Sequence, residues 1–390
     1  MPDIENNPDA SRVIKGLRDT GYEFVTAAAD VVDNSIEANA KNIKISLELE
    51  RDGKKFVYIA DDGDGMDKAG LLGAMKYGAD ERANPESLGK FGLGLKTASS
   101  AICLKFSVIS RKSGAEPLNK LSWDLEYVKK VNKWVHPEDP LTTAEEKKFA
   151  EYCGEKGTLV IWSKCDRLLP TYYAEPGGTK EKAAIKRLAN RLGEHCALTY
   201  HRFLDNKDKR ANNVFIEIDG NPIEAWNPFL PDHAEQMLPD KKKKIVCELQ
   251  DGSNAPAFMA AWILPHNDDL TDELKKKANI KNNRQGFYIF RYNRLIHSGD
   301  WLGMWINEPH HVLFRVEFDF GYELDDAFRV PVNKKGIEFD PELHKVIKSI
   351  LQPIYLEARK RFDKVAKKQA TRGIDHESSK VVQSKNISLA

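Results

Sequence analysis

Three short stretches of distinctive composition follow one another in the first quarter of the chain. They read DVVDN at 30–34, DDGDG at 61–65 and GKFGLGLK at 89–96. The first can place a carboxylate and a carboxamide on one helical face, the second can end a strand with an acid and two glycines, and the third can wrap backbone N–H groups around phosphates. Each pattern is weak alone, but this order is hard to mimic and indicates an ATP site.

The first stretch predicts a helix with an acidic face. At about 100° per residue, Asp30, Asp33, Asn34 and Glu37 share one stripe, and apolar residues lie opposite. An ordinary amphipathic surface helix is the alternative, but such a face usually mixes Lys or Arg with its acids, and this stripe has no cation. We therefore expect Mg²⁺ here, with Asn34 as its ligand and Asp30, one turn earlier, polarising an attacking water.

The second stretch follows a predicted strand at 54–60, in which buried and exposed positions alternate. Asp61 then lies at the carboxyl end of the strand, where a buried carboxylate can accept a hydrogen bond from the exocyclic amine of adenine. Gly63 and Gly65 allow positive φ and let a flat ring approach the backbone. A plain Asp-Gly turn is the alternative interpretation.

The third stretch opens a predicted helix at 95–101. Glycines at 89, 92 and 94 precede it, so exposed N–H groups and the helix dipole converge where an anion can bind. Lys96 and Thr97 add a cation and a hydroxyl. The string is neither a Walker A loop nor a complete dinucleotide-binding fingerprint. A flexible glycine loop without a ligand is the alternative.

The three stretches resemble the N, G1 and G2 boxes of the GHKL ATPases, the superfamily of gyrase B, Hsp90, MutL and the histidine kinases. The resemblance implies a Bergerat α/β sandwich, with an ATP lid at 67–88 that begins with a short helix capped by Asp67. A Thr on a later strand is a further family element, and Thr158 in GTLVIW at 157–162 supplies it.

The resemblance also implies the residues that contact ATP and Mg²⁺. Asn34 is the expected metal ligand. Gyrase B and MutL carry Glu where this chain has Asp30, so the shorter side chain favours slow hydrolysis. The expected nucleotide contacts are Asn34, Asp61, Gly63, Gly65, Met66, Gly89, Phe91, Gly92, Leu93, Gly94, Leu95, Lys96, Thr97 and Thr158.

Alternating strand patterns at 214–218, 286–292 and 312–318 predict a second, sheet-rich α+β domain. The string YIFRYNRLI at 288–296 is similar to the S5-like transducer domain of MORC proteins and MutL. Such transducers send a Lys back to the γ-phosphate, and the segment PVNKK at 331–335 resembles that loop. The resemblance therefore assigns this catalytic role to Lys334, with Lys335 close behind; a solvated basic turn is the alternative.

Length and composition agree with two domains, because 390 residues with 41% hydrophobic content can fill two modest cores. The expected organisation is an ATP-binding domain at 1–205 with an insertion at 127–156, a transducer at 206–340, a helix at 341–369 and a disordered tail at 370–390. Five cysteines without a C-x-x-C pair suggest a reducing environment. Neither a secretory signal nor a membrane-spanning segment is evident, so we expect a cytoplasmic protein.

The functional expectation is an ATP- and Mg²⁺-dependent conformational clamp. In this superfamily ATP closes the lid and associates two modules through N-terminal segments, here 1–24. A histidine kinase is disfavoured because residues 1–29 contain no histidine. Two alternatives stay open: an ATP-sensing module that does not hydrolyse, and a DNA-processing component like MutL or MORC. The net charge is +1, so any contact with DNA or a client protein would be local, at basic runs such as 241–244 and 359–372.

Overall fold

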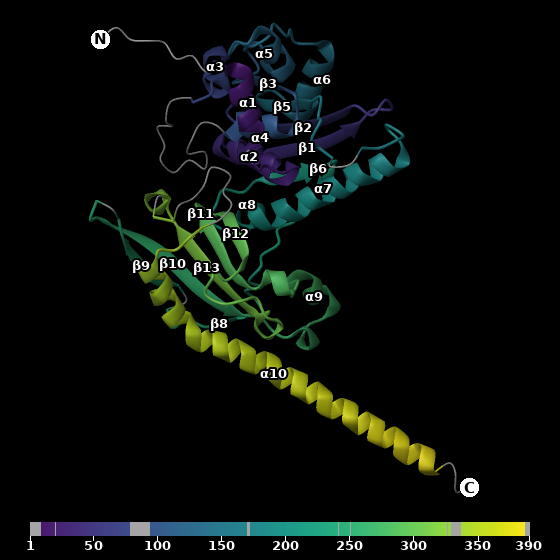
Figure 1. The fold of residues 1–390 in the computed structure, drawn as a ribbon, viewed down its shortest axis with the longest axis vertical. Coiled ribbons are helices and arrows are strands. Elements are labelled where there is room, and N and C mark those ends of the chain that lie inside the picture. The colour runs from purple at the N-terminus through teal and green to yellow at the C-terminus, as the bar shows by residue number, and fades with distance from the viewer. Residues whose placement is uncertain are drawn as a thin grey trace. The chain divides into compact units, whose positions relative to one another are not determined.

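The computed structural model describes residues 9–19, 21–78, 94–169, 172–240, 242–249, 251–325, 327–328 and 337–386, with side chains up to residue 365. The chain divides into two compact units between Ala225 and Trp226. Each unit combines one sheet with helices. The mixed α/β fold expected from the sequence is therefore confirmed (Figure 1).

The sheet of the first unit has the strand order β4-β3-β5-β2-β1-β6-β7. Its neighbouring strands are antiparallel, except for the parallel pair of β1 and β6. The strands are β1 Asn42–Leu49, β2 Lys55–Asp61, β3 Lys105–Arg111, β4 Asn119–Asp124, β5 Gly157–Ser163, β6 Phe215–Ile218 and β7 Asn221–Pro222.

The expected boundary between the domains differs from the observed one because of β6. The alternating pattern at 214–218 predicted a strand of the second domain, but β6 pairs with β1, where Ile43 lies opposite Ile216. Hydrogen bonding to an interior strand makes β6 part of the first sheet. The assignment of this strand to the transducer is therefore wrong, since the alternating pattern of a strand does not specify its partner.

Helices cover both faces of the first sheet (Figure 1). On one face, Val57 and Ile59 of β2 belong to the same core as helical residues such as Val32 and Ala98. On the other face, Ala60 packs against Phe149. This alternation follows from the two-residue period of the strand. The helices of this unit are α1 Ala10–Arg18, α2 Phe24–Glu37, α3 Lys68–Met75, α4 Gly94–Ile102, α5 Leu125–Val131, α6 Thr143–Tyr152, α7 Thr179–Thr199 and α8 His201–Leu204.

Side-chain caps mark the starts of several of these helices, including α3 and α6. The carboxylate of Asp67 accepts a hydrogen bond from the backbone N–H of Gly70 at 2.7 Å, so α3 begins with the predicted cap. Thr142 and Glu145 form a reciprocal capping box at the start of α6.

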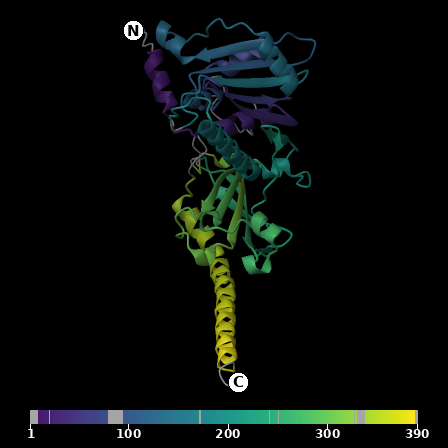
Figure 2. The ribbon, with the colours of Figure 1, turned by 90° about the vertical axis from the view of Figure 1, so that its right-hand side faces the viewer.

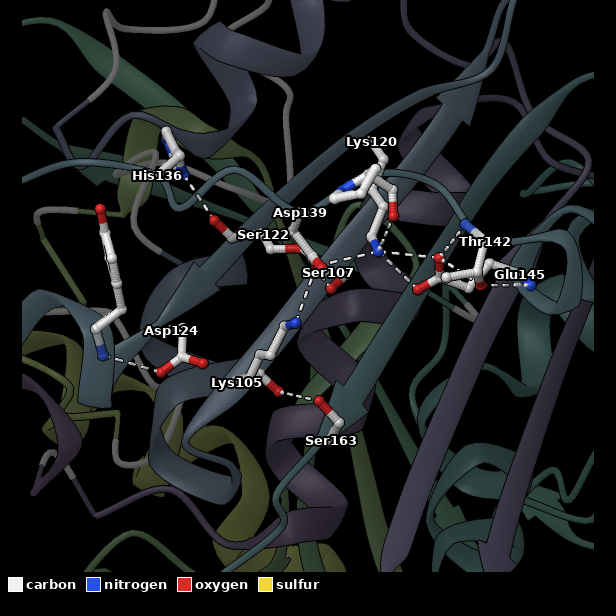
Figure 3. Close-up of polar contacts among 12 residues, drawn as sticks. Lys105, Ser107, Lys120, Ser122, Asp124, His136, Asp139, Thr142, Glu145 and Ser163 are labelled. Atoms are coloured by element: carbon white, nitrogen blue, oxygen red, sulfur yellow. Dashed lines mark hydrogen bonds and ion pairs between the residues drawn. The ribbon is translucent and has the colours of Figure 1, made fainter.

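The segment at 127–156 is fastened to the sheet by a cluster of ion pairs. The amine of Lys120 lies 3.0 Å from Asp139 and 2.8 Å from Glu145 (Figure 3). Burial raises the pKa of Asp139, but hydrogen bonds from Ser122, Lys105 and Lys120 outweigh it and lower this pKa to about 2. The cluster holds the chain leading into α6, and α6 supplies Phe149 to the second face of the sheet.

The second unit contains a sheet of strand order β12-β11-β13-β10-β8, and β9 also pairs with β10. β11 and β13 are parallel, and the other pairs are antiparallel. Its strands are β8 Glu235–Gln236, β9 Lys243–Glu248, β10 Asn254–Ile263, β11 Gly286–Arg291, β12 Arg294–Asp300 and β13 Phe314–Phe320. Its helices are α9 Asp272–Ala278, α10 Pro341–Asn386 and the 3₁₀ turns η1 Asn267–Asp269, η2 Asn282–Arg284, η3 Pro309–His311 and η4 Tyr322–Leu324.

Helix α10 packs its first half on the core of the second unit. Ile347 and Leu351 are fully buried there, and the ring of Tyr355 stacks on His311 at a centroid distance of 3.6 Å. The helix contains Pro353 in its interior, and it continues to Asn386, past the expected end at 369. In both views its far end leaves the sheet of this unit (Figure 1 and Figure 2). None of the helices in the described ranges has both the length and the apolar character needed to cross a bilayer.

Candidate nucleotide-binding site

The acidic stripe of α2 is mostly buried rather than solvent-facing. Asp30 and Asp33 are only 6% and 2% exposed. Asp33 Oδ1 accepts a hydrogen bond from the hydroxyl of Tyr200 at 2.8 Å, and Tyr200 directly follows α7. Asp33 therefore ties α2 to the end of α7. The sequence did not reveal this partner, because Tyr200 is far away along the chain.

Asp30 is held by a half-buried phenol. The hydroxyl of Tyr22 donates to Asp30 Oδ2 at 2.5 Å and also interacts with Thr97 of α4. Burial and then the neighbouring charge of Asp30 raise the pKa of Tyr22, so the phenol stays protonated and remains a donor. This contact fixes one oxygen of the carboxylate that the sequence nominated as the base. Sequence reasoning missed Tyr22, which lies before the helix.

Asn34 lies one turn after Asp30 and is half-buried. Its Nδ2 donates to the backbone carbonyl of Asp30 at 3.0 Å, which orients the carboxamide. The Oδ1 atom is a neutral, hard ligand of the kind that Mg²⁺ accepts. Across the part of the chain that the structure describes, no group of three or more His, Cys, Asp or Glu side chains is arranged to hold a metal. The chemistry of the Asn34 oxygen suits the expected role of this residue as one ligand of Mg²⁺.

Asp61 lies at the carboxyl end of β2, as the sequence predicted, and is only 5% exposed. Its Oδ2 accepts a hydrogen bond from the hydroxyl of Ser35 at 2.9 Å, and its Oδ1 accepts one from the N–H of Gly63 at 3.0 Å. Burial raises the pKa of Asp61 to about 6. Because Ser35 directly follows Asn34, α2 joins the region of the expected metal ligand to the expected adenine acceptor.

Thr158 lies directly opposite Asp61 in the pairing of β2 with β5. Its hydroxyl lies 2.9 Å from that of Ser110 on β3, and Ser110 Oγ also accepts a hydrogen bond from the N–H of Met66 at 2.8 Å. Three adjacent strands thus bring Asp61, Thr158 and Met66 together. Ser110 is a further residue that sequence reasoning missed, since a single Ser in a strand carries no distinctive signal.

Gly63 and Gly65 are required by close approaches within the protein itself. A Cβ on Gly65 would lie 2.0 Å from the carbonyl oxygen of Arg111, and its φ is +64°. A Cβ on Gly63 would lie 2.6 Å from the carbonyl oxygen of Ala38. A side chain at either position would displace the backbone of a neighbouring segment. Packing within the protein therefore requires glycine at both positions, in addition to any contact with a nucleotide ring.

The third stretch is described only from the start of α4. Gly94 begins the helix, Leu95 is half-buried, and Lys96 is 2% exposed with its amine donating to the carbonyl of Ala74 at 3.0 Å. Thr97 is buried beside Tyr22. The remaining expected site residues lie outside the described ranges; these are Gly89, Phe91, Gly92, Leu93 and Lys334.

Comparisons with known proteins bear on this geometry. Residues 22–156 match the family model described as histidine kinase-, DNA gyrase B-, and HSP90-like ATPase. A search of curated proteins gives no match. A solved structure described as the crystal structure of the N-terminal domain of a DNA repair protein aligns with a TM-score of 0.52 and 17% identity, over 90% of this chain and 98% of that chain. At this identity, the likeness concerns the fold alone.

Proposed function

We propose that this chain, whose residues 22–156 match the GHKL-type ATPases, binds ATP with Mg²⁺ and hydrolyses it slowly. The observation that carries the proposal is the buried carboxylate of Asp61 at the end of β2, hydrogen-bonded to Ser35 of α2. Burying an acid costs folding free energy, and ligand-binding sites are where proteins commonly bear such a cost.

Asp61 provides selectivity for adenine in this proposal. The ionised carboxylate accepts a hydrogen bond from the exocyclic amine of adenine, and guanine has no amine at that position. Ser35 and the N–H of Gly63 both donate to this carboxylate and hold it in place. Calorimetry should therefore detect ATP and detect GTP much more weakly.

Asn34 holds the metal, and Asp30 accepts the proton of the attacking water. When bound, Mg²⁺ neutralises charge on the phosphates. Tyr22 anchors Oδ2 of Asp30, and the carboxylate takes a proton from the water as its oxygen attacks the γ-phosphorus. The bond from this phosphorus to the β,γ-bridging oxygen breaks, and ADP leaves with that oxygen. General-base assistance of this kind contributes about 10²–10⁴ in rate. Because the side chain of Asp is shorter than that of Glu, we expect the contribution of this base to lie near the lower end of that range.

The conformational part of the proposal rests on the family resemblance. ATP closes the segment at 67–88, associates two copies through 1–24, and brings Lys334 to the γ-phosphate; hydrolysis resets the state. Contact with DNA or a client protein is the expected output. Sedimentation with and without a non-hydrolysable ATP analogue tests the association.

One observation favours a second candidate, an ATP sensor without turnover. The phenol of Tyr22 occupies an oxygen of Asp30, and a carboxylate engaged in this way is less accessible to water. Steady-state phosphate release separates the two functions, because a sensor binds ATP without releasing phosphate. Asp232→Asn, which changes an exposed acid of the second unit, is the matched control for both measurements.

A further inference from the structure

We propose that strand β9 of the second unit is a docking edge for β9 of a second copy of this chain. β9 pairs with β10, and among the strands that the structure describes none pairs with its other side. Figure 1 shows it at the edge of the sheet. An open edge of this kind is a template for adding a strand.

The hydrogen-bonding pattern identifies the backbone groups that face outward. The N–H of Leu249 donates to the carbonyl of Ser253 at 2.8 Å. Since hydrogen-bonded pairs alternate along an antiparallel ladder, Ile245 and Cys247 bond to β10, and the residues between them direct N–H and C=O away from it. The outward residues are Lys244, Val246 and Glu248.

The residue opposite Val246 agrees with this pattern. Val246 lies across from Pro256, which has no N–H to donate. The pair must therefore be one that exchanges no hydrogen bonds. The outer edge of β9 consequently presents the backbone groups of three alternate residues.

The side chains of this edge are complementary to those of the same edge in a second copy. Lys244, Val246 and Glu248 lie on the exposed face of β9, and Val246 is 60% exposed. Antiparallel pairing about a two-fold axis at Val246 places Val246 of both copies together and sets each Lys244 opposite Glu248 of the other copy. About six backbone hydrogen bonds would join the two edges.

A competing register is less favourable. Moving the axis to Ile245 would place Lys242 opposite Glu248, but Lys242 already forms an ion pair with Asp319 at 2.8 Å. It would also place Lys244 opposite Val246. The register centred on Val246 keeps the Lys242 pair intact and matches charge with charge, so it is the one we assign.

The charges on β9 also favour pairing with β9 of a second copy over pairing with other strands. Lys on an edge strand ordinarily discourages pairing with other chains, and only a strand with an acid at the matching position relieves this. Glu248 supplies that acid in a second copy. No residue of the proposed ATP site takes part, so this association needs no nucleotide.

Charge reversal in the full chain tests the register. Lys244→Glu and Glu248→Lys each replace both cross-copy ion pairs by like charges, and each changes an exposed side chain. Sedimentation without nucleotide, over the micromolar range, should show reversible dimers of the wild type. Each single variant should dimerise at least about tenfold more weakly.

Two further samples separate pairing from general charge effects. The double variant Lys244→Glu/Glu248→Lys and an equimolar mixture of the two single variants both restore opposite charges, so both should recover the wild-type dimer. A monomeric wild type, unaffected single variants, or no recovery in these samples would each overturn the proposal. Unchanged ATP binding and thermal unfolding confirm that the variants fold.

Discussion

The substitution Asp61→Asn should raise the stability of the fold and lower the affinity for ATP. Burial raises the pKa of Asp61 from 3.8 to about 6. The folded protein therefore binds a proton more tightly than the unfolded chain does, and the free energy of unfolding falls as the pH rises between these values. Each pH unit of separation corresponds to about 1.4 kcal/mol, so above pH 6 the buried charge costs about 3 kcal/mol at most.

The amide is nearly the same shape as the carboxyl group but carries no charge. At pH 8 and without nucleotide, we expect the free energy of unfolding of Asp61→Asn to exceed that of the wild type by about 1–3 kcal/mol. Near pH 4 this advantage disappears, because the wild-type side chain is then protonated. Ser35 can still share a hydrogen bond with an amide at this position.

Nucleotide binding should change in the opposite direction. The amide presents an N–H₂ group where adenine needs an acceptor, so affinity for ATP falls by about 10- to 100-fold. Denaturant unfolding at the two pH values and calorimetry with Mg-ATP measure the two effects, with Asp232→Asn, at an exposed acid of the second unit, as the control that changes neither. A variant that is less stable than the wild type at pH 8, or that binds ATP normally, would refute the reasoning.

The other variants concern turnover. Asp30→Asn should retain ATP binding and lose about 10²–10⁴ in phosphate release; wild-type turnover would remove Asp30 from the role of base. Tyr22→Phe removes the hydrogen bond to Asp30 Oδ2 and should slow phosphate release about tenfold at unchanged ATP affinity. Faster release would instead show that this hydrogen bond inhibits hydrolysis. Asn34→Ala should abolish the Mg²⁺ dependence of ATP binding measured by calorimetry, and a retained dependence would exclude Asn34 as ligand. Lys334→Ala should lower the turnover number, and full turnover would exclude that assignment.

The local elements of the site were predictable because their signals are local. The periodicity around Asp30 predicted α2, the alternation before Asp61 predicted the end of β2, and the helix formers after Gly94 predicted α4. The cap of α3 by Asp67 was predictable for the same reason. Each signal depends on neighbours within one or two turns, so a single sequence carries it.

The partners of these residues were not predictable. Tyr22, Ser35, Ser110 and Tyr200 hold the predicted acids and Thr158 in place, and none belongs to a distinctive pattern. Ser35, Ser110 and Tyr200 each bond to a residue of another element, and their neighbours in space depend on how those elements pack.

The sequence by itself determined the order of α2, the end of β2 and the start of α4, and from this order it predicts an ATP site. Only the tertiary structure decided that Asp33 binds Tyr200 rather than solvent, and that β6 joins the first sheet. The physical reason is range. Propensity, periodicity and capping act between residues close in the chain, whereas burial, strand pairing and the pKa of Asp61 depend on which distant segments exclude water from the same place.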